Sequence, residues 1–179
     1  FCPVFVCLVG GPSCIPEQKN GKEGGAAVKI ILVQHGDAVA SEKDPERPLS
    51  DKGRSQVKRL SEFLRRLPFY PALILHSGKA RTRETAEAVS FALGGVRVEE
   101  RSFLNPDDPI RPIEDELKAL GVNVLIVGHL PHLSKLAGSL LAGGEKRDIV
   151  EFTNASPLII DREKDSFRLD GYFRCEYMK

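Results

Sequence analysis

The chain has 179 residues, and 26 basic against 25 acidic side chains leave it with a net charge of +1. This length fits one domain with a sizeable core, and a charge so close to zero argues against a protein that binds nucleic acid in bulk. Hydrophobic residues make up 41% of the chain and charged residues 28%, the proportions of a soluble globular protein. No stretch reaches the run of about 18 apolar residues that a membrane-spanning helix requires, so we expect no membrane contact.

The cysteines are distributed unevenly along the chain. Cys2, Cys7 and Cys14 lie close to the start, and only Cys175 follows them. The main part of the sequence therefore has no framework of internal disulfides, and no spacing typical of a zinc site. This pattern predicts a cytoplasmic protein without a bound metal.

The first residues differ in composition from the rest. An apolar stretch, Phe1–Gly11, precedes a segment rich in Gly, Lys and Glu, and it lacks the basic n-region of a signal peptide. Two interpretations of residues 1–27 stay open: an upstream translated extension, or a flexible tail. In both, a single domain covers residues 28–179.

From Val28 onward, short apolar runs alternate with segments of helical periodicity. Continuous apolar runs of strand length predict buried strands at residues 29–33, 73–75 and 122–127. Apolar residues at helical spacing predict a helix that starts at the N-cap Ser50 and ends before Pro68, and three more at residues 80–93, 109–120 and 133–141.

Four further strands are predicted from shorter patterns. Residues 96–99 alternate in the manner of an edge strand, and C-terminal strands are expected at residues 149–153, 157–161 and 167–172, the last two as a hairpin. The alternation of apolar strands and helices predicts an α/β fold, a three-layer α/β/α sandwich on a mostly parallel mixed sheet.

Polar side chains follow three of the predicted buried strands. The first strand runs into Gln34-His35-Gly36, the second into His76 to Arg81, and the third into Gly128-His129. In parallel sheets these strand ends meet at one edge, where ligands bind. Two imidazoles and a guanidinium suit phosphoryl transfer: one imidazole attacks phosphorus, while the cation and the second imidazole, protonated, stabilise the oxygens. A glycine after the first histidine would let the backbone approach the ligand closely.

Four segments, in chain order, resemble the motifs of the histidine phosphatase (phosphoglycerate mutase-like) superfamily. The similarity is greatest to its small SixA-type phosphohistidine phosphatase branch and covers about residues 28–172. The matching segments are Gln34-His35-Gly36 for Arg-His-Gly, Arg47 to Gly53 for the Pro-Leu-Thr/Ser-x-x-Gly that opens the first helix, Ser77 to Ala86 for Ser-Pro-x-x-Arg-Ala-x-Gln-Thr-Ala, and Gly128-His129 for the strand-end Gly/Ser-His.

The resemblance implies a phosphoglycerate mutase-like fold and a role for each site residue. His35 would form a phosphohistidine intermediate that water then hydrolyses, and Arg81 and His129 would hold the phosphoryl oxygens. No metal or other cofactor would be required. The phosphate-binding set expected from the motifs is Gln34, Gly36, Lys79, Arg81 and His129.

Two other histidines are expected to be structural or surface residues. His76 precedes the motif serine by one position and would face away from it in a strand, and His132 lies in the first turn of a predicted helix.

Gln34 is the main departure from the family's pattern. The family's arginine offers a charged, bidentate fork at this position, whereas glutamine offers one neutral amide. Losing such a contact costs on the order of 2–4 kcal/mol in the transition state. Two hypotheses stay open: Lys79, Arg83 or Arg47 compensates, with Lys79 the first candidate, or the protein is a weak or inactive enzyme that still binds phosphate.

No general acid for the leaving group is evident. Only Asp107 and Asp108 lie near the expected rim of the pocket, and a pair of aspartates beside proline is more typical of a turn. The SixA-type branch also lacks an evident acid. A phosphohistidine substrate tolerates this, because its P–N bond breaks readily once the imidazole is protonated.

The sequence therefore predicts a metal-independent, monomeric phosphatase that acts on phosphohistidine in a partner protein, such as a phosphotransfer domain. A non-catalytic module that binds a phosphorylated ligand is the first alternative, because of Gln34. A phosphatase for small phosphorylated substrates is the second. Mutase activity is disfavoured, because the short chain leaves little room for a lid that retains the intermediate.

Overall fold

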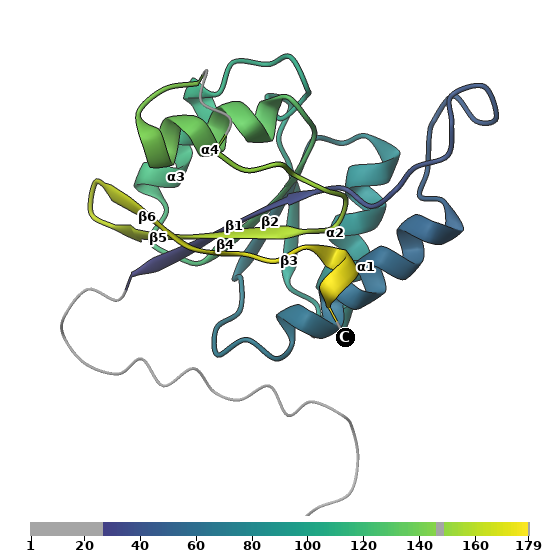
Figure 1. Ribbon diagram of the computed structural model, residues 1–179, viewed down its shortest axis with the longest axis horizontal. Coiled ribbons are helices and arrows are strands. Elements are labelled where there is room, and N and C mark those ends of the chain that lie inside the picture. Colours follow the sequence, from purple (N-terminus) through teal and green to yellow (C-terminus); the bar gives the residue numbers. More distant parts are fainter. Residues whose placement is uncertain (1–26, 146–148, 179) are drawn as a thin grey trace, which may run out of the picture.

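The computed structural model describes residues 27–145 and 149–178, which form one mixed sheet covered by helices on both faces (Figure 1). The strands are β1 (Val28–Gln34), β2 (Leu73–His76), β3 (Arg97–Glu100), β4 (Val124–Gly128), β5 (Pro157–Glu163) and β6 (Ser166–Tyr172). They lie in the order β3-β2-β4-β1-β5-β6. The first four strands are parallel, and the β5–β6 hairpin continues the sheet in the antiparallel sense.

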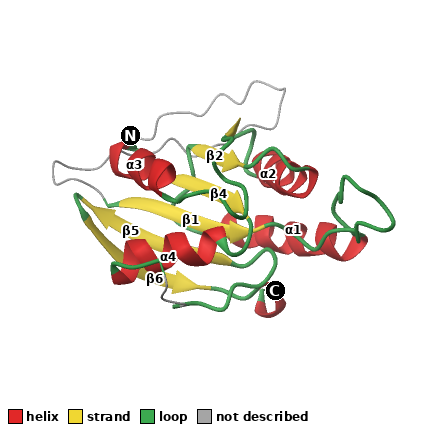
Figure 2. Ribbon diagram, turned by 90° about the horizontal axis from the view of Figure 1, so that it is seen from above, coloured by secondary structure: helices red, strands yellow, loops and turns green. Residues whose placement is uncertain are grey.

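Four helices make up the outer layers, together with a short 3-10 turn near the C-terminus. They are α1 (Asp51–Leu64), α2 (Ala80–Ala92), α3 (Arg111–Ala119), α4 (His132–Ala142) and η1 (Cys175–Tyr177). The helices α1 and α2 cover one face of the sheet, and α3 and α4 cover the other (Figures 1 and 2). The predicted three-layer sandwich on a mostly parallel mixed sheet is confirmed.

The strand β1 shows why its sequence is a continuous apolar run. Ile30 and Leu32 are buried beneath α3 and α4, whereas Ile31 and Val33 are buried beneath α1 and α2. A strand with a hydrophobic core on each face needs apolar side chains at every position. Because β1 pairs with β4 on one side and β5 on the other, its carboxyl end, where Gln34 lies, is in the middle of the sheet.

One predicted strand is wrong. Residues 149–153 form an irregular segment rather than a strand. The amide of Thr153 donates to the hydroxyl of Tyr172 over 3.0 Å, and this hydroxyl donates to the carbonyl of Glu151 over 2.8 Å. The apolar side chain that suggested a strand, Phe152, packs into the core beneath α3 and α4. The hydroxyl of this tyrosine thus forms hydrogen bonds with backbone groups that would otherwise pair with a neighbouring strand.

The first strand begins at Val28, where the folded domain was expected to start. The extension predicted for residues 1–27 lies, apart from Ala27, outside the described residues. In the described ranges, no helix combines the length and the apolar character that crossing a bilayer demands.

Candidate active site

The three predicted catalytic residues come together at the carboxyl edge of the sheet. His35 directly follows β1, His129 directly follows β4, and Arg81 lies in the first turn of α2. The parallel register pairs Gln34 with Gly128, so the two histidines leave the sheet side by side. Their ring centroids are 5.1 Å apart, in an edge-to-face arrangement of 64°. The sheet therefore brings together residues that are far apart in the sequence.

The hydrogen bonds of His35 determine which of its ring nitrogens carries the proton. Nδ1 lies 2.7 Å from the carbonyl oxygen of Gly36, and Nε of Arg81 donates to Nε2 over 3.1 Å. A carbonyl can only accept and a guanidinium can only donate, so Nδ1 is protonated and Nε2 carries the lone pair. Burial, reinforced by the positive charges of Arg81 and Arg47, lowers the pKa of His35 to about 4. At neutral pH its Nε2 is unprotonated, as a nucleophilic ring nitrogen has to be.

The backbone around His35 is held by a loop from the C-terminal part of the chain. Nδ2 of Asn154 donates to the carbonyl of His35 over 2.8 Å, and the amide of Ala155 donates to the carbonyl of Gln34 over 2.8 Å. The amide of His35 in turn donates to the carbonyl of Gly128 over 3.2 Å. Sequence reasoning missed Asn154, because no motif or periodicity distinguishes it.

Gly36 has a role in packing. A Cβ atom there would lie 2.9 Å from Val57 of α1, and 3.0 Å from both the carbonyl oxygen of Gly53 and the side chain of Leu49. Its amide donates to the hydroxyl of Thr85 over 3.2 Å. The structure therefore places the amide of Gly36 against α2, whereas close approach to a ligand was the role expected from sequence.

His129 is almost completely buried, with 2% of its surface exposed. Its Nε2 lies 2.7 Å from Oγ of Ser77. Burial, together with the charge of Arg81, lowers the pKa of His129 to about 3. The imidazole is therefore neutral at pH 7 in the ligand-free site, and it becomes the predicted protonated group only when a bound anion offsets this burial.

The amide side chain of Gln34 has an unusual environment. Its Oε1 is buried and has no hydrogen-bond partner among the described residues. An acceptor left unpaired in this way costs about 1–3 kcal/mol. The position that matches the family's arginine is thus occupied by a side chain whose amide oxygen is buried and unpaired among the described residues.

Of the three cations considered as replacements for that arginine, two act on the site. The charge of Arg47 lowers the pKa of both His35 and Arg81, and the charge of Lys79 lowers that of His129. The charge of Arg83 instead contributes to lowering the pKa of His76, which burial mainly causes. Arg47 therefore joins Lys79 as a candidate phosphate-binding cation.

The remaining polar residues that the sequence singled out lie in structural positions. His76 accepts a hydrogen bond at Nδ1 from the amide of Gly78 over 3.0 Å, within the turn between β2 and α2. His132 is fully buried in α4. Asp108 accepts from the amide of Asn105 over 2.7 Å, which is turn chemistry, and Asp107 is exposed.

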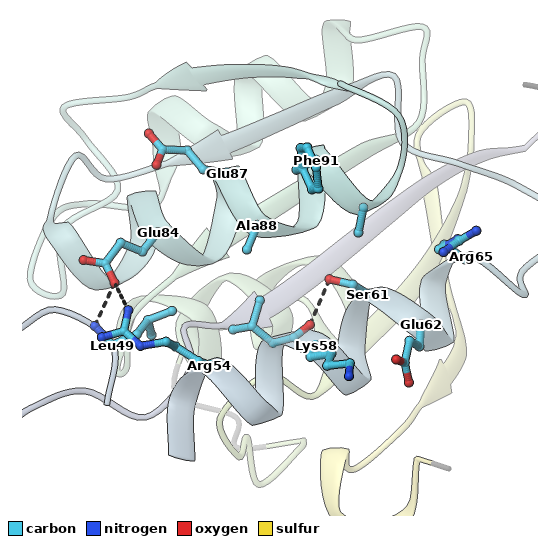
Figure 3. Close-up of a pocket in the computed structure, with 12 residues that line it drawn as sticks. Leu49, Arg54, Lys58, Ser61, Glu62, Arg65, Glu84, Glu87, Ala88 and Phe91 are labelled. Atoms are coloured by element: carbon cyan, nitrogen blue, oxygen red, sulfur yellow. Dashed lines mark hydrogen bonds and ion pairs between the residues drawn. The ribbon is translucent and has the colours of Figure 1, made fainter. Parts of the chain in front are cut away.

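A surface groove of about 600 Å³ lies between α1 and α2, and it is lined by residues other than His35, Arg81 and His129 (Figure 3). At one end, Glu84 accepts a hydrogen bond from the amide of Leu49 over 3.0 Å and forms an ion pair with Arg54 over 3.6 Å. Phe91, which is 86% exposed, lies on α2 and contributes to the lining. The contacts of Glu84 join the loop that carries Arg47 to the helix that carries Arg81.

Comparison by sequence gives matches to part of the chain. Residues 30–105 match the model of the histidine phosphatase superfamily (branch 1). An uncharacterized chloroplastic protein of Arabidopsis thaliana is 33% identical over 70 residues, which are 37% of this chain and 32% of that protein. The matched region thus spans about a third of that curated relative.

Solved structures of similar fold cover most of the chain. The protein histidine phosphatase SixA, in complex with tungstate, has a TM-score of 0.77 at 23% identity, over 85% of this chain and 100% of that one. A phosphoglycerate mutase of Bacillus anthracis has a TM-score of 0.67 at 16% identity, over 86% of this chain and 96% of that one. A mycobacterial glucosyl-3-phosphoglycerate phosphatase has a TM-score of 0.64 at 19% identity, over 80% of this chain and 97% of that one. The fold is phosphoglycerate mutase-like.

Proposed function

We propose that this chain is a member of the histidine phosphatase superfamily, and that it is a metal-independent phosphatase whose nucleophile is Nε2 of His35. The pair of hydrogen bonds on this imidazole carries the proposal: Nδ1 donates to the carbonyl of Gly36, and Nε2 accepts from Arg81. Together they present a neutral nucleophile beside a cation, which is the combination that phosphoryl transfer needs.

The first step forms a phosphohistidine. The lone pair of His35 Nε2 attacks phosphorus, the bond from phosphorus to the leaving group breaks, and the leaving group departs with the electron pair. Arg81, already 3.1 Å from the attacking atom, transfers its hydrogen bond to the phosphoryl oxygens. His129, whose ring centroid is 5.1 Å from that of His35, contacts the same phosphoryl group from one side.

The second step is hydrolysis. A water oxygen bonds to phosphorus as the bond from phosphorus to His35 Nε2 breaks, and Nε2 recovers its lone pair. The proton of the water passes to a phosphoryl oxygen, inorganic phosphate leaves with it, and Arg81 returns to its bond with His35. Charge on the oxygens is balanced by protein cations in both steps, so the scheme requires no metal. Among the described residues, no cluster of three or more His, Cys, Asp or Glu side chains is arranged as a metal site.

We propose phosphohistidine in a partner protein, for example in a phosphotransfer domain, as the substrate. The support is chemical: neither Asp107 nor Asp108 hydrogen bonds to His35, Arg81 or His129 in the part of the chain described. An imidazole leaving group needs no strong acid from the enzyme. The buried free thiol of Cys175 supports a reducing compartment such as the cytoplasm.

Two observations favour other functions. Gln34 stands where the family's pattern has an arginine, so the pocket has one cation fewer, which favours a module that binds phosphorylated ligands without turnover. The fold shared with glucosyl-3-phosphoglycerate phosphatase favours a small phosphate ester as substrate.

One comparison separates these functions. Purified protein is incubated, in excess EDTA, with a histidine-phosphorylated phosphotransfer domain and separately with an alkyl phosphate ester. We expect faster release of phosphate from the protein, and a radiolabelled enzyme intermediate that is stable to base and labile to acid. His35→Ala should abolish both turnover and labelling, whereas His129→Ala should slow turnover.

Other results would contradict the proposal in different ways. Faster turnover of the ester would support the small-molecule phosphatase, and binding without turnover would support the binding module. Loss of activity in EDTA that a divalent ion restores would overturn the metal-independent mechanism.

A further inference from the structure

A row of buried hydroxyl groups leads from His129 to a backbone carbonyl. Nε2 of His129 lies 2.7 Å from Oγ of Ser77, and this Oγ lies 3.0 Å from Oγ1 of Thr82. Thr82 donates to the carbonyl of Lys79 over 2.8 Å, where α2 begins. Ser77 is 6% exposed and Thr82 is fully buried. No charged side chain takes part in this row.

The carbonyl at the end of the row sets the direction of every hydrogen bond in it. Because a carbonyl oxygen can only accept, Thr82 uses its single hydroxyl proton on Lys79. The oxygen of Thr82 must then accept from Ser77, which uses the only proton of that hydroxyl. Ser77 can therefore only accept from His129, so the neutral imidazole carries its proton on Nε2.

We propose that Ser77 and Thr82 are positioning residues, which hold His129 in its Nε2–H tautomer and leave Nδ1 as the unprotonated nitrogen available to a bound phosphoryl group. Nδ1 has no hydrogen-bond partner among the described residues, which fits an atom reserved for a ligand. The part of this inference that concerns catalysis rests on the proposed phosphatase function. The part that concerns the tautomer rests on the hydrogen bonds alone.

The row gives the two catalytic imidazoles opposite tautomers. His35 is protonated on Nδ1 by its bond to the carbonyl of Gly36, and His129 on Nε2 through the hydroxyl row that ends on Lys79. Each ring is thus anchored on a backbone carbonyl, whose position the fold determines. A tautomer fixed in advance removes one rearrangement from the reaction, and misassignment of the tautomer is costly in histidine-dependent catalysis.

The tautomer is measured directly by two-bond 1H–15N correlation spectra of the histidine rings in the intact protein without ligand. We expect the His129 signals of the Nε2–H form in the wild type, and a mixture with the Nδ1–H form in Ser77→Ala. Thr82→Val keeps the shape of the side chain but removes the hydroxyl, so it should also give a mixture of the two tautomers of His129. Thr82→Ser keeps the hydroxyl and should retain the wild-type spectrum.

The kinetic consequence is tested with phosphoramidate, a small phosphoryl donor. We expect kcat to fall by about 10- to 100-fold in Ser77→Ala and Thr82→Val, the scale seen when a group that orients a histidine is removed. Thr82→Ser keeps the hydroxyl and should retain most of the wild-type kcat. Ser90→Ala is the matched control, because Ser90 is another buried hydroxyl of α2, bonded to the carbonyl of Val96. It should lower thermal stability while leaving kcat and the His129 spectrum unchanged.

The outcomes separate this inference from the proposed function. An Nδ1–H tautomer of His129 in the wild type, or a tautomer unaffected by both Ser77→Ala and Thr82→Val, would overturn the positioning role even in an active enzyme. If the wild type does not hydrolyse phosphoramidate but shows the expected spectra, the phosphatase proposal fails and the tautomer assignment holds. Should Ser77→Ala not fold, Thr82→Val and Thr82→Ser decide the question.

Discussion

Nε of Arg81 donates a hydrogen bond to Nε2 of His35 over 3.1 Å, so the guanidinium occupies the direction from which phosphorus must approach. A phosphoryl group can bond to His35 only by displacing this contact. In doing so it places its oxygens on Arg81, which is then close to the charge that develops in the transition state. In the proposed mechanism, this contact therefore marks the position of the reacting phosphoryl group.

Replacement of Arg81 should reduce catalysis far more than replacement of Arg83. Arg81→Ala removes the cation next to His35, and we expect kcat/KM for phosphoramidate to fall by about 100- to 1000-fold. Arg83, two positions along the same helix, is exposed and exerts its charge on His76, so Arg83→Ala should leave kcat/KM nearly unchanged. Equal losses in the two variants would contradict the site described here.

Introducing the arginine that the family's motif contains should increase activity. Gln34→Arg replaces a neutral amide with a bidentate cation, and it removes a buried oxygen that has no partner among the described residues. We expect kcat/KM to rise about 10-fold or more, the effect of one charge-assisted contact. Steady-state kinetics at neutral pH measure this. An unchanged rate would mean that another cation already fills the role.

Arg47 is the cation that we expect to fill part of this role. Its charge lowers the pKa of both His35 and Arg81, so Arg47→Ala should reduce kcat/KM in the wild type and reduce it less in the Gln34→Arg background. Lys43→Ala, in the same exposed loop, is the control and should have little effect. Additive losses in the double-mutant cycle would show that the two positions act independently.

Stability should fall as the solution becomes acidic. All four histidines have a lowered pKa in the folded protein, mainly because they are buried, with His35 at about 4 and His129 at about 3. In the unfolded chain they titrate near about 6.5, so below that pH the unfolded state binds more protons. Their contribution to stability is complete above about pH 6.5 and is lost as the pH falls toward the folded pKa values.

Urea unfolding at several pH values measures this effect. The free energy of unfolding should decrease by up to about 1.4 kcal/mol per pH unit for each histidine below about pH 6.5. His35→Gln should reduce the slope of the free energy of unfolding against pH by roughly the contribution of one bound proton. A wild-type profile that is level from about pH 7.5 to about pH 5 would show that the histidines are not buried in their neutral forms.

Gly36→Ala should destabilise the protein and disturb the nucleophile at the same time. The added methyl group would meet Val57, the backbone of Gly53 and Leu49 at 2.9–3.0 Å, and relief requires movement of the loop that carries His35. We expect a loss of about 1–3 kcal/mol in stability, with reduced kcat. Gly121→Ala is the control, because nothing lies within 4 Å of its added methyl group and it should be tolerated.

Local patterns in the sequence were sufficient for most of the architecture and for the positions of the candidate catalytic residues. A continuous apolar run predicted β1, and the strand ends predicted that His35 and His129 meet, because parallel strands bring their carboxyl ends to one edge. The N-cap at Ser50 is also confirmed, since its Oγ accepts from the amide of Gly53 over 3.0 Å. These features depend on periodicity and on short-range contacts, which neighbouring residues specify.

The tertiary structure alone decided the details on which the chemistry depends. The tautomer proposed for His129 depends on Ser77, which is 52 positions away in the sequence. The packing role of Gly36 follows from contacts with α1, and residues 149–153 are irregular because the hydroxyl of Tyr172 bonds their backbone. Hydrogen-bond direction and close packing depend on atoms that only the folded chain brings within a few ångströms, so no pattern of neighbouring residues encodes them.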